Sequence, residues 1–123
     1  MTEPRIDGYH IHIYHQGEAD RTVAERVGEG VAERLGLELR RSTGEPRGPH
    51  PVPQFRLKFT AAQFDQVVPW LMLNREGADV LIHPLSDNSY DDHTKYAIWL
   101  GAPKELRLSG MRGQYRPEQY PTA

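Results

Sequence analysis

Two kinds of apolar pattern alternate along this chain, and their order limits the possible folds more than any other feature. In three segments every second residue is apolar, which is typical of strands with one buried face. In two others apolar residues recur every three or four positions, which is typical of amphipathic helices. With two further β-like runs, the predicted strands lie at 9–14, 37–40, 54–59, 80–83 and 96–100, and the predicted helices at 20–35 and 60–76.

The order strand-helix-strand-strand-helix-strand, followed by one more strand, predicts an α+β protein. It is the order of a ferredoxin-like βαββαβ sandwich with an additional strand. Both helices would cover one sheet face, and a second subunit commonly protects the other. We therefore expect a homodimer, assembled as an α/β barrel-like structure. Residues 1–108 should form one domain and 109–123 a loosely ordered C-terminal tail, because that tail is polar and interrupted by glycine and proline.

The composition excludes several classes of function. The 123 residues include 15 lysines and arginines and 17 aspartates and glutamates, a formal net charge of −2. No overall positive field would therefore attract nucleic acid or an anionic membrane. The longest apolar run is far shorter than the roughly 20 residues that cross a bilayer, and the N-terminus does not resemble a signal peptide. We expect a cytoplasmic protein whose partners are small molecules or other proteins.

Cysteine is absent, whereas six histidines are present. Thiolate chemistry is therefore excluded, while imidazole is a common metal ligand and titrates near neutral pH. In the first predicted strand His10 and His12 share one face, opposite Ile11 and Ile13. The same alternation places His83 of the fourth strand on that face, so these histidines should converge.

Two more histidines lie in loops from which each can close over an end of this face. His50 is bracketed by prolines, and His93 follows Asp92. A rigid backbone suits a preorganised ligand, and a carboxylate beside an imidazole suits an acid or base. His15 is out of phase with the strand histidines and is expected to have no role. Taken alone, any one of these histidines is also compatible with a half-exposed polar residue that has no role. The prolines are also compatible with rigid turns that serve no ligand.

Imidazoles without thiolates fit a first-row metal such as Fe(II), Zn(II), Mn(II) or Cu(II), and do not fit Ca(II) or Mg(II). A carboxylate would complete a facial triad with two histidines. No aspartate or glutamate has a secure inward position beside them, so that place stays open.

A series of short motifs carries a resemblance to a known family. They are HIHIY at 10–14, GPHPVPQF at 48–55, VPWL at 68–71, VLIHP at 80–84, the pair at 92–93 and AIWLG at 97–101. These motifs, in this order, resemble the DOPA 4,5-dioxygenase family of fungal and bacterial proteins. The resemblance implies a small ferredoxin-like domain that opens a catechol ring beside its two hydroxyls with non-haem Fe(II) and O₂. With L-DOPA, extradiol cleavage gives a seco-DOPA that cyclises to betalamic acid or muscaflavin, depending on the bond cut.

The reaction that the resemblance implies calls for several roles, and we divide them among the histidines by inference. Extradiol cleavage needs Fe(II) with open positions for catechol and O₂, together with a group that accepts and returns a proton. We expect His12, His50 and His83 as Fe(II) ligands and His93 as the acid and base. His10 would stand beside the ligands or replace one of them. Which three groups bind the metal, and whether a carboxylate is one, stays open.

Polar and aromatic strand residues would complete a substrate pocket. Arg56 or Lys58 would hold a substrate carboxylate, and Tyr96 and Trp99 would wall the ring. All four are equally compatible with exposed or packing residues of the sheet. The expected partners are a catechol, O₂ and a second copy of the chain, and the physiological catechol stays open.

Two other functions compete with this one. In the first, the protein is a non-catalytic dimer that binds a metal such as Zn(II) or a small ligand. In the second, it is a ferredoxin-like monooxygenase that works without a metal. Metal analysis and the effect of chelators on activity separate the three.

Overall fold

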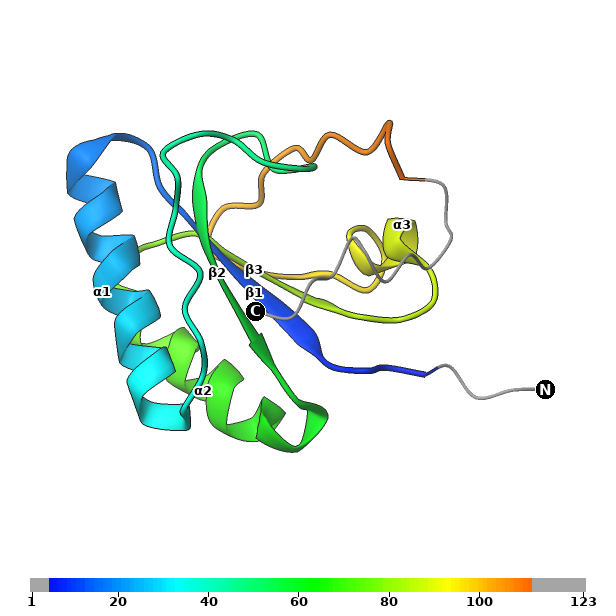
Figure 1. The fold of residues 1–123 in the computed structure, drawn as a ribbon, viewed down its shortest axis with the longest axis horizontal. Helices are drawn as coiled ribbons and strands as arrows, with labels where there is room; N and C mark the ends of the chain where they lie inside the picture. Colours follow the sequence, from blue (N-terminus) through cyan, green and yellow to red (C-terminus); the bar gives the residue numbers. More distant parts are fainter. Residues whose placement is uncertain (1–4, 112–123) are drawn as a thin grey trace.

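A four-stranded antiparallel sheet forms the centre of the computed structural model, which describes residues 5–111. Its strands lie in the order β2-β1-β3-β4, and each neighbouring pair is antiparallel. Figure 1 shows α1 and α2 together on one side of the sheet and α3 on the other. This α+β arrangement is consistent with the expected ferredoxin-like fold. The elements are β1 (Tyr9–Tyr14), α1 (Gly17–Leu35), β2 (Gln54–Phe59), the 3-10 helix η1 (Ala61–Gln63), α2 (Phe64–Asn74), β3 (Val80–Pro84), α3 (Ser89–Asp92) and β4 (Ile98–Leu100).

The sheet face under α1 and α2 carries the hydrophobic core, as the alternation predicts. Ile11 and Ile13 of β1 are completely buried, and Leu57 of β2 lies opposite Ile11. Removal of this apolar surface from water is the main stabilising contribution, about 25 cal/mol per Å². The core side chains from the other elements are Val27 and Val31 of α1, Val67, Val68 and Leu71 of α2, Phe55 and Phe59 of β2, and Val80 and Ile82 of β3.

The strand predicted at 37–40 is wrong, because only one bridge forms there. Arg40 and Arg56 exchange two backbone hydrogen bonds of 2.8 and 3.0 Å. The Leu37 N–H instead donates to the Ala32 carbonyl at 2.9 Å and so completes the end of α1. Leu39 packs against Gly28 of that helix. Within residues 5–111 the sheet therefore has four strands and not five.

The segment between β3 and β4 also differs from its prediction. The sequence assigns no helix between the strands predicted at 80–83 and 96–100, but this segment contains α3. Asn88 caps the short helix by accepting a hydrogen bond from the Asp91 N–H at 3.0 Å. The strand expected at 96–100 begins only at Ile98. The Tyr96 N–H donates to the Asp91 carbonyl at 3.0 Å, which holds Tyr96 in a turn.

Two sequence signals mark the ends of the helices. Gly36 ends α1 in the left-handed conformation, with φ 67°. Thr60 and Gln63 form a capping box, which opens η1 before α2 begins. Gly30 lowers the intrinsic helix propensity of α1, but a Cβ there would lie 2.9 Å from the Trp70 ring of α2. Glycine at this position therefore allows the two helices to approach closely.

None of the helices within residues 5–111 is long and apolar enough to span a bilayer. The tail expected at 109–123 lies mostly outside the described residues. Its first part, 109–111, is described and lines the cavity discussed below.

Gly101, directly after β4, is the glycine whose replacement we expect to destabilise the fold most clearly. Its φ is +88°, and a Cβ would lie 2.5 Å from Asp79 Oδ1 and 2.6 Å from Arg75 Nη1. Gly101→Ala should lower the free energy of unfolding by about 2 kcal/mol. Urea denaturation measures this, with Gly110→Ala, where nothing lies within 4 Å, as the matched control. Equal midpoints for the two variants would contradict the packing described.

Candidate metal centre

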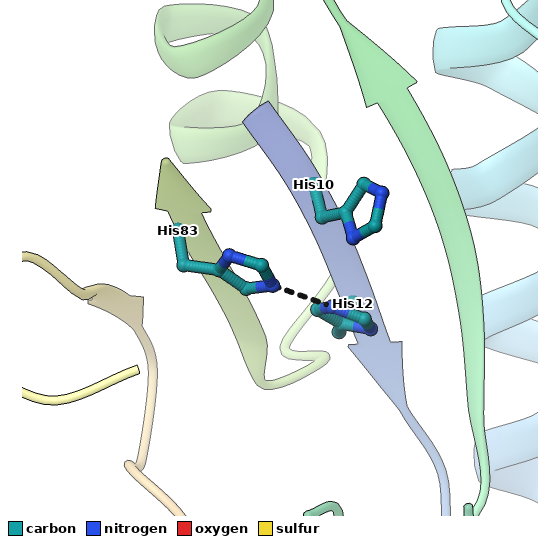
Figure 2. A group of neighbouring side chains, drawn as sticks. All are labelled: His10, His12 and His83. Atoms are coloured by element: carbon teal, nitrogen blue, oxygen red, sulfur yellow. Dashed lines mark hydrogen bonds between the residues drawn. The ribbon is translucent and has the colours of Figure 1, made fainter. Parts of the chain in front are cut away.

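Three imidazoles converge on the sheet face opposite the core. His10 and His12 project from β1 and His83 from β3, as Figure 2 shows. The register pairs His10 directly with His83. One nitrogen of each ring lies within 4.8 Å of one nitrogen of the other two, and all three side chains are buried. The alternation along β1 and β3 thus assembles a group of donors that is able to hold a metal ion.

The hydrogen bonds of two of these rings reveal where their lone pairs point. His12 Nδ1 lies 2.9 Å from the side-chain carbonyl oxygen of Gln54, and His83 Nδ1 lies 2.9 Å from the Pro84 carbonyl. Carbonyl oxygens only accept, so each Nδ1 must donate its proton. Each neutral ring therefore carries its lone pair on Nε2, the usual arrangement in a metal-binding histidine.

The two Nε2 atoms face one another at 3.0 Å (Figure 2). Two acceptors at this distance repel unless a cation lies between them or one ring takes up a proton. Two metal–imidazole bonds of about 2.1 Å at a right angle would separate their nitrogens by about 3.0 Å. The donor set thus fits a first-row metal such as iron or zinc.

Burial keeps this cluster neutral at physiological pH. The pKa of His10 falls to about 3, first because the ring is desolvated and then because Arg56 and Lys58 are near. Desolvation also holds the pKa values of His12 and His83 well below their usual range, with neighbouring imidazoles adding to the effect. Neutral imidazole is the form that binds a metal, so no proton must first be removed.

His50 lies against the cluster but presents the opposite tautomer. Its ring centroid is 4.1 Å from that of His12, and its Nδ1 lies 2.7 Å from the buried Tyr14 hydroxyl. Burial raises the pKa of Tyr14, so the phenol keeps its proton. A phenol can donate or accept, but among the described residues His50 Nδ1 is the one partner of this buried hydroxyl, so we infer that the phenol donates and Nδ1 accepts. Desolvation lowers the pKa of His50 to about 3. The neutral His50 ring therefore carries its proton on Nε2.

His93 directly follows α3, and its ring lies beside the histidine cluster, next to His83. Its ring centroid is 4.0 Å from that of His83, and its Nδ1 donates to the Ser89 carbonyl at 2.7 Å. Desolvation lowers its pKa. His93 Nε2 therefore carries a lone pair. The neighbouring Asp92 accepts a hydrogen bond from the Ser86 N–H at 3.0 Å and another from the Ser86 hydroxyl, so its carboxylate organises the loop before α3.

A cavity of about 590 Å³ opens over the imidazoles. Its volume is within the range of small-molecule sites. Gln54 and Arg56 of β2 line it, together with all five of the histidines described above, so the structure brings these sequence-predicted residues together. The loop before β2 and the segment after β4 close it, through Arg47, Gly48, Pro49, Arg107, Ser109, Gly110 and Met111.

Four other residues considered in the sequence lie elsewhere. Tyr96 is 45% exposed and does not line the cavity. Trp99 stacks on Tyr14 with a centroid distance of 5.9 Å and does not line the cavity. Lys58 lies opposite His10 in the register without lining the cavity. His15 is buried away from the cluster, where its Nε2 lies 2.6 Å from the Ser42 hydroxyl.

The sequence did not reveal the contributions of Arg47, Arg107 and Met111. The Arg107 N–H donates to the Pro49 carbonyl at 2.7 Å, which joins two segments that are 58 positions apart (107 minus 49). No periodic pattern in either segment signals that they meet.

The fold and the site together define a small α+β protein with a buried histidine group able to bind a metal. Comparison with known proteins adds three relationships. A candidate dioxygenase from Nostoc punctiforme has a crystal structure that matches with a TM-score of 0.80 at 47% identity, covering 84% of this chain and 89% of that one. A DOPA 4,5-dioxygenase of Amanita muscaria is 29% identical, covering 99% of this chain and 58% of that protein. An uncharacterised 21.2-kDa protein of Botryotinia fuckeliana is 36% identical, covering 89% of this chain and 68% of that protein.

The model of the Dopa 4,5-dioxygenase family matches residues 9–110, nearly all of the described chain. The chain belongs to this family, as its motifs indicated. Membership and the structural neighbour support an oxygenase.

Proposed function

We propose that this protein is an extradiol dioxygenase, which opens a catechol ring such as that of L-DOPA with non-haem Fe(II) and O₂. The observation that carries the proposal is the buried group of His10, His12 and His83, whose nitrogens lie within 4.8 Å of one another at the base of a cavity. Family membership supports a dioxygenase reaction. When bound, Fe(II) would supply adjacent positions for the catechol oxygens and O₂.

We assign His12 and His83 as ligands because their lone pairs face one another. The spacing favours His10 as the third ligand, in place of the His50 expected from the sequence. His50 keeps its proton on Nε2 through Tyr14, and a protonated nitrogen cannot bind a metal. His50 stays the alternative third ligand should its ring reverse its tautomer. The described group contains no carboxylate.

The two remaining histidines have complementary proton positions. His93 Nε2 carries a lone pair and would accept a proton from a catechol hydroxyl. His50 Nε2 carries a proton and would donate a hydrogen bond to a negatively charged oxygen in the cavity. The bond of His93 to Ser89 supports its assignment as the acid and base. Arg56 would contact the substrate, while Tyr96 and Trp99 are less suited because neither lines the cavity.

Oxygen uptake is the first test of this function. Protein reconstituted with Fe(II) should consume O₂ with L-DOPA or another catechol and form a yellow product, and a strong chelator should stop the reaction. Zinc-loaded protein is the control, because it fills the site without activating O₂. Turnover that resists chelation would favour the metal-free monooxygenase. Metal binding with no oxidation of any catechol would favour the non-catalytic binder.

The homodimer, its barrel-like assembly and the cytoplasmic location stay predictions. The bare sheet face that motivated the dimer is covered in part by the protein's own segments, those before β2 and after β4.

A further inference from the structure

The cavity over the histidines carries positive charge of its own. Three arginines line it: Arg47, Arg56 and Arg107. Among the described residues that line the cavity, none is an aspartate or a glutamate. None of the three arginines forms an ion pair with a carboxylate within residues 5–111. An anionic group entering this cavity therefore finds cations that no described side chain has neutralised.

Arg56 is the best placed of the three to meet a substrate. It lies on β2 directly opposite His12 of the imidazole cluster. Its Nε is buried and has no hydrogen-bond partner in the described part of the chain. Desolvation, and then the nearby charge of Arg40, lower the pKa of its guanidinium. A buried donor without a partner costs stability. Arg56 is only partly buried and lines the cavity, so the accessible part of its side chain is able to meet an anion there.

Arg47 and Arg107 stand at the rim on two segments that are held together. The bond from the Arg107 N–H to the Pro49 carbonyl fixes the second segment against the loop of Arg47. Both side chains are exposed, so water screens their charges. They would draw an anion toward the opening, and Arg56 would bind it inside.

We propose that the site selects catechols whose side chain ends in a carboxylate and lacks an ammonium group, with Arg56 as the residue that binds the carboxylate. The proposal rests on the ring-cleaving function above. L-DOPA carries both a carboxylate and an ammonium group, and the described lining offers the ammonium group no anionic partner. A dihydroxyphenyl alkanoate such as dihydrocaffeate, which is L-DOPA without its amine, has the complementary charge.

Four catechols of similar size test this selection. We expect kcat/KM to be about 10- to 100-fold higher for dihydrocaffeate than for L-DOPA. This is the size of effect expected when one charged group, the ammonium group of L-DOPA, enters the cavity without a partner of opposite charge. Uncharged methylcatechol should rank below dihydrocaffeate, and cationic dopamine should rank last. Equal kcat/KM values for dihydrocaffeate, methylcatechol and dopamine would overturn the proposal.

An arginine variant tests the assigned residue. Arg56→Gln should raise KM for dihydrocaffeate about 10- to 100-fold while changing kcat/KM for methylcatechol about twofold at most. Arg56→Lys should restore part of the affinity. Arg34→Gln removes the same charge from exposed α1, away from the cavity, and should change neither value. An equal loss on both substrates in Arg56→Gln would make the residue structural and contradict the proposal.

A binding measurement separates this proposal from the function on which it rests. Phenylpropionate has no hydroxyls, so calorimetry with metal-free protein reports the carboxylate site without any turnover. We expect it to bind the unmodified protein and not Arg56→Gln, and we expect phenylethylamine not to bind. If phenylpropionate binds through Arg56 but no catechol is cleaved, the anion site stands and the dioxygenase function fails. If catechols are cleaved and phenylpropionate does not bind, the dioxygenase function stands and the proposed anion site fails.

Discussion

His12→Ala protein is expected to lose both its metal and its activity. Removal of His12 Nε2 takes away one of the two lone pairs that face each other at 3.0 Å. Loss of a residue that merely orients a ligand typically weakens a metal site 10- to 100-fold, so loss of a ligand should weaken it by more than about 100-fold. Catechol cleavage should fall at least as far. Calorimetric titration of the metal and oxygen uptake measure the two effects.

Further variants show that the effect belongs to the cluster. His83→Ala should match His12→Ala, whereas His15→Ala, which changes a buried histidine bonded to Ser42, should keep metal and activity. His10→Ala and His50→Ala identify the third ligand. We expect the first to lose the metal and the second to keep it while turning over more slowly. Metal affinity within a few-fold of normal in His12→Ala would contradict the assignment.

The metal-free protein is expected to lose much of its stability in mild acid. In the unfolded chain each histidine titrates near 6.5, while in the folded protein the pKa values of His10 and His50 are about 3. Between these values the unfolded state binds more protons, so the free energy of unfolding decreases as the pH falls through this window. Each group contributes a slope of about 1.4 kcal/mol per pH unit. The two together give about 3 kcal/mol per unit near pH 5.

Urea denaturation at several pH values measures this slope. Over the roughly 3.5 pH units between the two pKa values this slope removes about 9–10 kcal/mol, which is most or all of the stability of about 5–15 kcal/mol that is typical of a domain. His10→Gln is the matched variant, because it removes one titrating group. Its free energy of unfolding should depend less steeply on pH, because about one proton fewer is taken up on unfolding. This difference in slope does not depend on the stability of the variant at neutral pH. A free energy of unfolding that does not change between about pH 7 and pH 4 would contradict the buried, neutral state of the cluster.

Strand periodicity was enough to predict the centre of the site. In β1 the alternation of Ile11 and Ile13 with His10 and His12 determines which side chains meet the helices and which face the cavity. The same rule places His83 beside them, because the neighbouring strand has the same period. These positions depend only on local patterns, so a single sequence reveals them.

Other parts of the site depend on contacts that no local pattern records. The predicted strand at 37–40 is reduced to one bridge, because Leu37 completes the end of α1 instead of pairing. The adjacency of Asp92 and His93 in the sequence does not determine the direction of either side chain. Asp92 accepts hydrogen bonds from Ser86, and His93 Nδ1 donates to the Ser89 carbonyl. Arg107 lines the cavity because its backbone N–H bonds to the Pro49 carbonyl, far away in the sequence.

Differences in tautomer allow the histidines of one buried cluster to have different roles. His12 and His83 donate from Nδ1 to carbonyl oxygens, whereas His50 accepts at Nδ1 from Tyr14. Tyr14→Phe would remove that donor and leave His50 free to carry its proton on either nitrogen. The hydrogen-bond partners outside the cluster therefore decide which rings bind a metal and which carry a proton.

Isotope labelling tests the central claim, that this protein is a ring-cleaving dioxygenase, most directly. Iron-loaded protein would be incubated with a catechol under O₂ made of the heavy oxygen isotope, and the product examined by mass spectrometry. We expect a ring-opened product in which both heavy atoms from one O₂ molecule are incorporated, apart from exchange with water at the aldehyde. A product with an intact ring, or with a single labelled atom once exchange is controlled, would contradict the account.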